Sequence, residues 1–158
     1  MLGDLVARER LRRQVLLDAE QPILAVADER VLALRRDHPL AQKQHVEWGD
    51  LDDVRLITVS RDSGNRILLD NTLLSAGLHL DGFYEVQHLS TSLGLVESGL
   101  GVAILPSMAM PGPEHEVLCQ RELPEPRIDR TIGLLRRRGE SLSPIAELFI
   151  EILLKRWN

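Results

Sequence analysis

The chain has 158 residues, and 44% of them are hydrophobic, which is enough for a packed core and excludes general disorder. Its formal net charge of −5 argues against a broad nucleic-acid-binding surface. A single cysteine, Cys119, excludes a disulfide framework within the chain, and the lack of a long apolar run or signal-peptide core predicts a cytoplasmic protein with no membrane partner.

The first part of the chain predicts one helix and two short strands. Residues 4–19 are charged and carry apolar positions at the spacing of a modestly amphipathic helix. Pro22 ends this pattern, and the apolar runs at 23–27 and 30–35 predict two separate strands. The second strand ends before Pro39, because a residue that precedes proline avoids the helical region.

The middle of the chain predicts alternating strands and helices. A short helical turn at 48–53 leads into a strand at 55–60, and a further short strand is expected at 83–86. Between them, Ser63 has the residue type of a helix N-cap and Gly77 that of a C-terminal stop. The apolar positions of the helix between these two residues include Leu69, Leu73 and Ala76.

A Gly-x-Gly sequence, Gly99 to Gly101, stands between a predicted helix at 90–98 and an apolar run at 102–105. The dinucleotide-binding fingerprint needs a strand, then glycines, then a helix, and a third glycine where this chain has Ile104. The order here is reversed, so no cofactor is expected. We expect instead that Gly99 ends the helix in a left-handed conformation and that Gly101 permits a tight start to a strand of a buried parallel sheet.

The last third of the chain predicts two strands and the best-signalled helix. Prolines between 111 and 127 indicate loops around a short segment at 117–123, and a strand is expected at 130–136. Ser143 is the expected cap of the final helix, with Pro144 at its first position. Its apolar face consists of Ile145, Leu148, Phe149, Ile152 and Leu153. The alternation of strands and helices predicts an α/β fold.

Four stretches in order resemble the C-terminal effector-binding domain of LysR-type bacterial transcription regulators. They are the helix followed by GLGVAILP, and residues 30–41, 46–64 and 130–154. The resemblance covers residues 23–156 and implies a two-lobed, periplasmic-binding-protein-like (type 2) fold with a small effector in the cleft. It places an N-terminal helix and part of the first lobe at 1–36, a nearly complete second lobe at 37–131, and the return strand and C-terminal helix of the first lobe at 132–158.

The start of the chain departs from the family pattern. It carries no winged helix-turn-helix and lacks the opening part of the first lobe, as expected for a fragment, a truncated reading frame or a shortened protein completed by a partner. DNA contact is therefore expected only through a winged helix-turn-helix that this chain lacks. The partial first lobe would leave apolar faces of 23–35 and 144–157 uncovered, which predicts a homo-oligomer.

The resemblance implies an effector cleft lined by helix N-termini, whose unpaired backbone N–H groups favour a carboxylate. Both candidate termini follow predicted strands, so they are expected at the same end of the sheet, where they would bind a small organic anion. Ser63, and Ser90 or Thr91, are also candidates for plain helix caps. Arg61 or Arg66 could pair with the effector, or instead lie in solvent or pair with Asp62 or Asp70. The candidate effector-binding residues are Ser60, Arg61, Asp62, Ser63, His88, Leu89, Ser90 and Thr91.

Other patterns favour neither an enzyme nor a metal site. The aspartates at 50, 52 and 53 lack the glycine and glutamate spacing of a calcium loop, and the histidines show no metal-ligand spacing. No G-x-S-x-G elbow occurs, and the arginines at 136–138 are expected to be solvated. Effector sensing is the expected function. The alternatives are a module that pairs with full-length LysR-type regulators and a small solute-binding protein.

Overall fold

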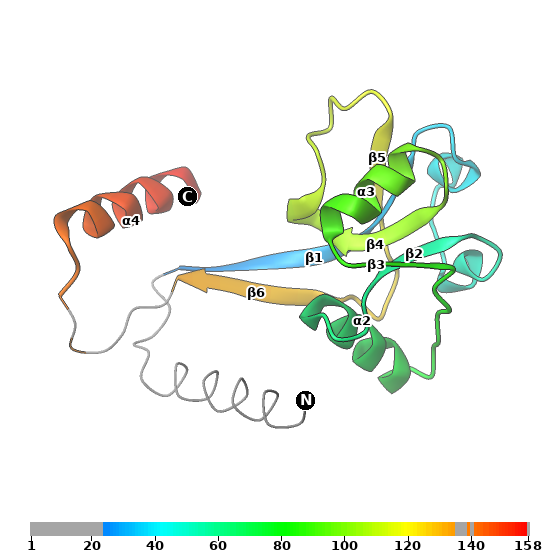
Figure 1. The fold of residues 1–158 in the computed structure, drawn as a ribbon, viewed down its shortest axis with the longest axis horizontal. Coiled ribbons are helices and arrows are strands. Elements are labelled where there is room, and N and C mark those ends of the chain that lie inside the picture. Colours follow the sequence, from blue (N-terminus) through cyan, green and yellow to red (C-terminus); the bar gives the residue numbers. More distant parts are fainter. Residues whose placement is uncertain (1–23, 135–138, 140, 158) are drawn as a thin grey trace. The chain divides into compact units, whose positions relative to one another are not determined.

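The computed structural model describes residues 24–134, 139 and 141–157, so the helix expected at 4–19 and the arginines at 136–138 lie outside the described residues. The chain divides into two compact units, one of residues 28–130 and the other of residues 1–27 and 131–158. Strands β1 (Leu24–Arg35) and β6 (Asp129–Leu134) each contribute residues to both units (Figure 1).

A mixed sheet of six strands has the order β3-β2-β4-β1-β5, and β6 pairs with β1. Strand β2 is parallel to both of its neighbours, β3 and β4, whereas β1 is antiparallel to β4 and β5. The parallel sheet expected around residues 102–105 is therefore confirmed on the β2 side of β4 and wrong on its β1 side. Strand β4 lies between a parallel neighbour, β2, and an antiparallel neighbour, β1, so a continuous apolar run does not by itself specify a parallel sheet. The remaining strands are β2 (Leu56–Val59), β3 (Tyr84–Val86), β4 (Val102–Pro106) and β5 (Leu118–Glu122).

The prediction of two strands at 23–27 and 30–35 was wrong, because β1 is continuous across both. Asp28 and Glu29 lie between the two apolar runs. Asp28 and Arg30 are buried, with exposed fractions of 0% and 4%, and Glu29 between them is exposed. The strand continues through these charges, and Asn65, Ser107 and Arg130 of the same unit form hydrogen bonds with them.

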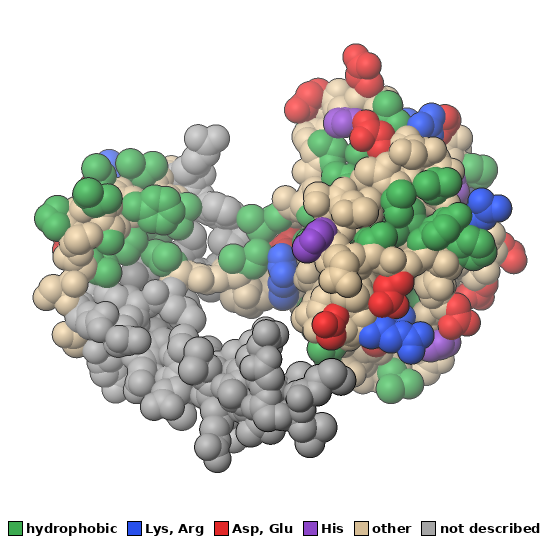
Figure 2. Space-filling model, in the orientation of Figure 1, with side chains coloured by type: hydrophobic (Ala, Val, Ile, Leu, Met, Phe, Trp, Pro, Cys, Tyr) green, Lys and Arg blue, Asp and Glu red, His purple; other side chains and the backbone are tan. Residues whose placement is uncertain are grey.

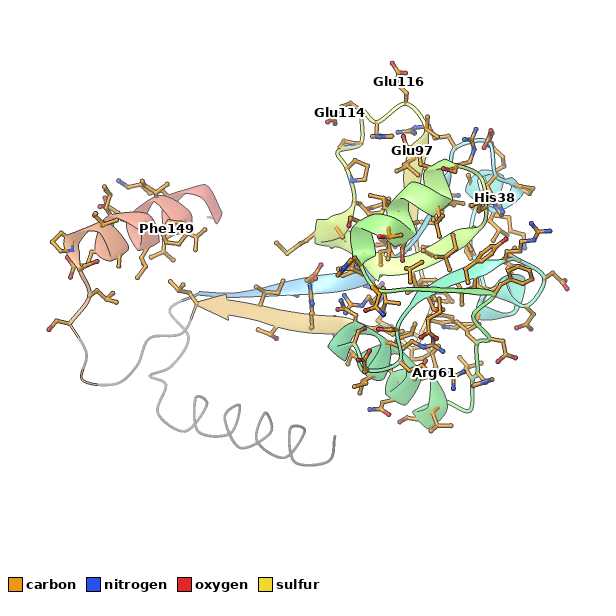
Figure 3. The ribbon with its side chains drawn as sticks, in the orientation of Figure 1. His38, Arg61, Glu97, Glu114, Glu116 and Phe149 are labelled. Carbon is orange, nitrogen blue, oxygen red and sulfur yellow. The ribbon has the colours of Figure 1, made fainter. Side chains whose placement is uncertain are left out.

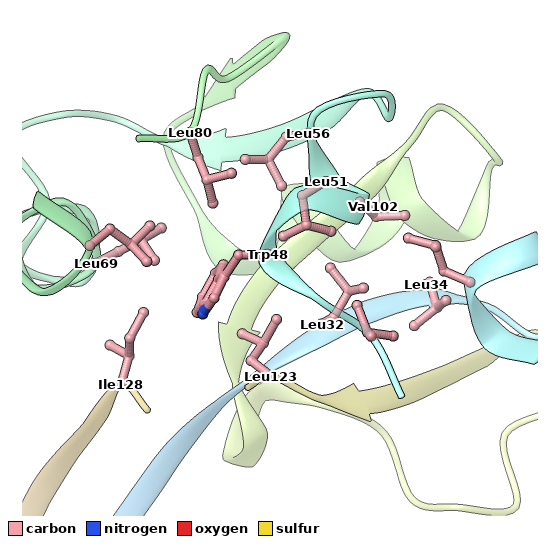
Figure 4. Close-up of a cluster of buried hydrophobic side chains, with 13 residues drawn as sticks. Leu32, Leu34, Trp48, Leu51, Leu56, Leu69, Leu80, Val102, Leu123 and Ile128 are labelled. Carbon is pink, nitrogen blue, oxygen red and sulfur yellow. The ribbon is translucent and has the colours of Figure 1, made fainter. Parts of the chain in front are cut away.

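Two hydrophobic clusters lie on opposite faces of the sheet, because successive side chains of a strand point to opposite sides. Helix α2 (Gly64–Ser75) contributes Leu69 and Leu73 to the first cluster, which surrounds Trp48 (Figure 4). Helix α3 (Leu89–Glu97) contributes Val96 to the second. Neighbouring strand residues alternate between the clusters: Leu32 and Leu34 belong to the first and Ala33 to the second, as do Leu56 and Ile57 respectively.

The helix ends of this unit follow the predicted signals. The Ser63 Oγ accepts a hydrogen bond from the Arg66 N–H at 3.1 Å, which confirms it as the N-cap of α2. Gly77 and Gly99 both have left-handed backbone, with φ of 72° and 78°. Ala76 does not belong to the buried face of α2, because it is the exposed C-cap residue.

Gly101 lies where the chain passes very close to Arg55. A Cβ atom on Gly101 would stand 2.1 Å from the Arg55 carbonyl oxygen, and the next N–H, of Val102, donates to that oxygen at 3.0 Å. The expected role of Gly101 as a small residue at a tight strand start is confirmed.

The predicted short turn and the C-terminal helix are both present. The 3-10 helix η2 (Trp48–Leu51) fills the expected turn, and η1 (Pro39–Gln42) and η3 (Ser107–Ala109) are further single turns. The Ser143 Oγ accepts from the Ala146 N–H at 3.3 Å at the start of α4 (Pro144–Trp157). Several apolar side chains of α4 are exposed, as the view in Figure 2 shows. None of the helices in the described part of the chain is long and apolar enough to cross a membrane.

Candidate functional site

Three strands of the 28–130 unit end at one edge of the sheet, which we call the carboxyl edge. Because β2 is parallel to β3 and to β4, their C-terminal ends lie side by side. Helix α2 follows β2 and helix α3 follows β3, and the Ser60 N–H donates to the Val86 carbonyl at 2.9 Å. The two predicted helix N-termini therefore lie at the same end of the sheet, as expected.

Most polar side chains at the α2 N-terminus are already bonded to one another. The Ser60 Oγ donates to the Asp62 carboxylate at 2.6 Å, and the Ser63 Oγ caps the helix. Arg61, labelled in Figure 3, is 83% exposed, and its Nε lies 4.0 Å from the Glu85 carboxylate. Arg61 is thus the side chain of this group that extends into solvent.

Arg66 is paired within its own helix. Its side chain is only 7% exposed, and its Nε lies 2.7 and 2.8 Å from the two Asp70 carboxylate oxygens. Of the two roles considered for Arg66, the structure shows the pairing with Asp70.

The α3 N-terminus has no side-chain cap. The helix begins at Leu89, and its N-cap residue, His88, makes no capping hydrogen bond through its side chain. The prediction that Ser90 or Thr91 caps this helix was wrong, because both lie inside its first turn. His88, Ser90 and Thr91 are exposed and Leu89 is half-buried. The Thr91 N–H already donates to the His88 carbonyl at 3.1 Å, so the candidate donors of this turn are its hydroxyl groups and the N–H groups of Leu89 and Ser90.

Ser92, one residue further on, is a polar group that the candidate set lacked. Its side chain is completely buried, and within the described part of the chain its Oγ has no hydrogen-bond partner. The sequence gives one weak signal for it, the run of hydroxyl residues that also contains Ser90 and Thr91.

A second polar group on the 28–130 unit was not predicted at all, and we call it the arginine cluster. It comes from β1, the start of α2, the turn after β4, and β6. Its β1 member Arg30 pairs in register with Pro106, the last residue of β4, which places it at the carboxyl edge. The arginine cluster consists of Asp28, Arg30, Asn65, Ser107 and Arg130.

The Asp28 carboxylate is the centre of this cluster. Its Oδ1 accepts from the Ser107 hydroxyl at 3.1 Å and the Met108 N–H at 3.2 Å, and its Oδ2 accepts from the Arg130 Nε at 2.8 Å. Burial by itself raises the pKa of Asp28, but the hydrogen bonds from Met108, Arg130 and Ser107 outweigh it and hold the pKa below its ordinary value. Asp28 is therefore an ionised, fully buried carboxylate.

Asn65 joins the two arginines. Its Oδ1 accepts from the Arg30 Nη2 at 2.8 Å and from the Arg130 Nη1 at 3.1 Å. The sequence signal for the cluster is an alternation of period two, because Asp28 and Arg30 lie on one face of β1 whose other residues are apolar. Long-range partners such as Asn65 give no such signal.

Asp50, the first of the three aspartates between 50 and 53, has structural partners. Asp50 accepts from the Glu47 N–H at 2.9 Å and pairs with the Lys43 Nζ at 2.5 Å, within the capping of η2. Within the described ranges, no group of three or more His, Cys, Asp and Glu residues is placed to hold a metal ion.

Two open pockets of this unit lie away from both helix N-termini. One has a volume of about 520 Å³ and is lined by residues 44–47 and 120–124 together with Arg127. The other has about 440 Å³ and includes Arg35, His38 and Gly99. Their linings mix both signs of charge and contain none of the predicted effector-binding residues.

The sequence family described as LysR substrate binding domain matches residues 11–158. The chain is 51% identical over 128 residues to the uncharacterized HTH-type transcriptional regulator YbhD of Escherichia coli (strain K12), covering 81% of this chain and 40% of that protein. It is 32% identical over 127 residues to the uncharacterized HTH-type transcriptional regulator YfeR of Shigella flexneri, covering 80% and 41%. The effector-binding domain of QuiR in complex with shikimate has the same fold, with a TM-score of 0.64 and 25% identity over 89% of this chain and 66% of that one.

The chain spans about two fifths of the length of these curated relatives. The match nevertheless extends over nearly all of its own residues, and the sheet order and helix positions follow the predicted α/β, periplasmic-binding-protein-like arrangement. The chain belongs to the LysR substrate-binding domain family.

Proposed function

We propose that the carboxyl edge of the 28–130 unit binds a small organic anion and that the chain is the effector-sensing part of a LysR-type transcription regulator. The observation that carries this proposal is the uncapped N-terminus of α3 at the same sheet edge as the N-terminus of α2. In open α/β sheets, ligands bind outside the carboxyl ends of the strands.

The chemistry of the α3 N-terminus favours a negative charge. The first backbone N–H groups of a helix have no partner within the helix, and its dipole is positive at that end. His88 makes no capping hydrogen bond through its side chain, and the Thr91 N–H donates to the His88 carbonyl, so the donors proposed for a ligand are the N–H groups of Leu89 and Ser90. The hydroxyl groups of Ser90 and Thr91 add two exposed donors beside them.

The effector-binding domain of QuiR supports the same chemistry. That domain was solved in complex with shikimate, which is a carboxylate. The proposal for this chain is a ligand of the same chemical class, a small carboxylate, bound by Ser60, Arg61, Asp62 and Ser63 at one helix and by His88, Leu89, Ser90 and Thr91 at the other.

The regulatory role rests on the relatives. YbhD and YfeR are named as HTH-type transcriptional regulators, so effector binding by this chain would control transcription in the cytoplasm. DNA contact is assigned to a winged helix-turn-helix, and the homo-oligomer expected for the chain would bring effector domains together.

A thermal-shift screen of metabolite carboxylates, including shikimate, tests the proposal. We expect carboxylates to raise the melting temperature, and neutral sugars and amines at equal concentration to leave it unchanged. The double variant Ser90→Ala/Thr91→Ala should reduce the shift. Ser98→Ala, at the exposed C-terminal end of the same helix, is the matched control and should retain it.

Two results would contradict the proposal. One is stabilisation by cations or neutral compounds only. The other is a carboxylate shift that the Ser90→Ala/Thr91→Ala variant retains in full, since the ligand would then bind elsewhere on the chain.

A further inference from the structure

The arginine cluster carries one more positive than negative charge. It holds the guanidinium groups of Arg30 and Arg130 and the carboxylate of Asp28. Among the described residues, Asp28 is the only carboxylate within ion-pair distance of either arginine, at 3.8 Å from the Arg30 Nη1 and 2.8 Å from the Arg130 Nε. Its two oxygens already accept from Ser107, Met108 and Arg130.

Arg30 is the member whose charge is least satisfied. Its side chain is 2% exposed, and its buried Nη1 has no hydrogen-bond partner among the residues that the structure describes. Burial first, and the neighbouring Arg130 charge second, lower the pKa of Arg30 below its usual range. A buried cation with an unused donor is costly unless a negative charge compensates it.

The orientation of the Asn65 side-chain amide leaves its two N–H donors unused by the arginines. A guanidinium group only donates, so the Asn65 atom that faces both arginines is the Oδ1. The Nδ2 group, with its two hydrogens, therefore points away from the arginines. Arg130 is 37% exposed, and its Nη2 is not used in the bonds to Asp28 and Asn65.

We propose that the arginine cluster is an oxyanion-binding subsite in which a carboxylate, sulfate or phosphate group accepts hydrogen bonds from the Arg130 Nη2 and the Asn65 Nδ2. The bound group supplies the negative charge that Arg30 and Arg130 share and Asp28 alone does not balance. This subsite goes beyond the helix-terminus site proposed above, because it uses a different set of side chains. Its occupant is either a free inorganic oxyanion or an acidic group of the organic effector.

The substitution Asn65→Asp tests this proposal. An aspartate between the two guanidinium groups supplies the missing negative charge from within the chain. We expect the variant without added anion to melt at the wild-type temperature or above it. The wild-type chain should be stabilised saturably by millimolar sulfate or malonate, by about 2–4 °C relative to chloride at equal ionic strength, and the variant should not be.

Arg127→Gln is the matched control. Arg127 is an exposed arginine three residues before Arg130, and it pairs with Glu29 and Glu125 rather than with the cluster. This variant should keep the full anion-dependent shift. Because sulfate also stabilises proteins without binding to a specific site, the informative quantity is the difference between wild type and Asn65→Asp at each anion concentration.

The choice of added anion distinguishes a free inorganic oxyanion from an acidic group of the effector as the occupant of the subsite. A shift with sulfate and malonate that Asn65→Asp removes identifies a site for free oxyanions. A shift with shikimate alone that Asn65→Asp removes assigns the subsite to the acidic group of an effector. Either result supports the proposal.

Three results would overturn it: no specific shift with any of these anions, a shift that Asn65→Asp retains in full, or a lower melting temperature for Asn65→Asp without anion. A shikimate shift that is retained in Asn65→Asp and lost in Ser90→Ala/Thr91→Ala would overturn this subsite while leaving the helix-terminus site in place.

Discussion

Asp28 shows how a single buried charge is made tolerable. Three donors from Ser107, Met108 and Arg130 replace the water that the carboxylate loses, and the lowered pKa is the measure of that replacement. A group whose folded-state pKa is lowered stabilises the fold at pH values above its ordinary pKa. That stabilisation is lost as the pH falls through the folded-state value.

We therefore expect Asp28→Asn to lower the free energy of unfolding at pH 7 by about 3 kcal/mol, because it leaves buried donors facing a neutral amide. The deficit relative to wild type should shrink as the pH falls below about 4, where the unfolded chain takes up the proton, until the pH passes the lowered folded-state pKa of Asp28. Urea unfolding of wild type and variant between pH 7 and pH 3 measures both the deficit in unfolding free energy and its dependence on pH. Asp81→Asn, at a side chain that is 95% exposed, should leave the stability at pH 7 unchanged. A deficit independent of pH would show that the charge of Asp28 has no part in it.

At the scale of single elements, the start of β4 depends on Gly101. Since a Cβ there would meet a backbone oxygen at 2.1 Å, the obstacle is not a side chain that can rotate away. We expect Gly101→Ala to destabilise the chain by about 1–3 kcal/mol, the usual range for overpacking a close contact.

Gly94→Ala is the comparison for Gly101→Ala. Gly94 lies within α3 with no atom near the position of a Cβ, so alanine there should stabilise by about 0.5–1 kcal/mol through its better helix propensity. Chemical denaturation of both variants measures the two effects. Equal effects of the same sign would contradict the close approach at Gly101.

Elements whose signals are local were predictable from the sequence. Ser63, Gly77 and Gly99 mark helix ends through the residues immediately around them, and each lies where the pattern placed it. The continuity of β1 was not predictable, because Asp28 and Arg30 are tolerated in a strand only through partners at positions 65, 107 and 130.

The candidate site also has one part that could be predicted from the sequence and another that could not. The two helix N-termini could be located because the strand-to-helix order is visible in the chain. The absence of a side-chain cap on α3 could not be predicted from the sequence. The side chains of Ser90 and Thr91 suit a cap, and only the observed start of the helix at Leu89 places them inside it. The arginine cluster depends on tertiary contacts throughout.

At the scale of the whole molecule, the exposed apolar side chains of α4 predict self-association. Ile145, Leu148, Phe149 and Ile152 are 81%, 55%, 58% and 56% exposed, and Phe149 is labelled in Figure 3. A contiguous apolar patch of this kind marks an interaction surface. We expect sedimentation velocity at micromolar concentration to show a dimer or larger species.

Phe149→Glu should shift that distribution towards the monomer while the melting temperature changes little, because the side chain is more than half exposed. Ile67→Glu, at an exposed apolar residue of α2, is the control and should not change the distribution. A wild-type chain that sediments as a single monomeric species would refute self-association through α4.

The bond between Asp28 and Arg130 joins residues 102 positions apart, at the first and last residues of one compact unit. This ion pair has a consequence for how the two residues change during evolution. If Asp28 alone were replaced, the buried Arg30 and the partly exposed Arg130 would both lose the carboxylate that they share, so this single replacement should be selected against more strongly than a paired one. Across descendants of a common ancestor, the residues at 28 and 130 should therefore change together, and lineages that have lost the aspartate should also have lost the arginine.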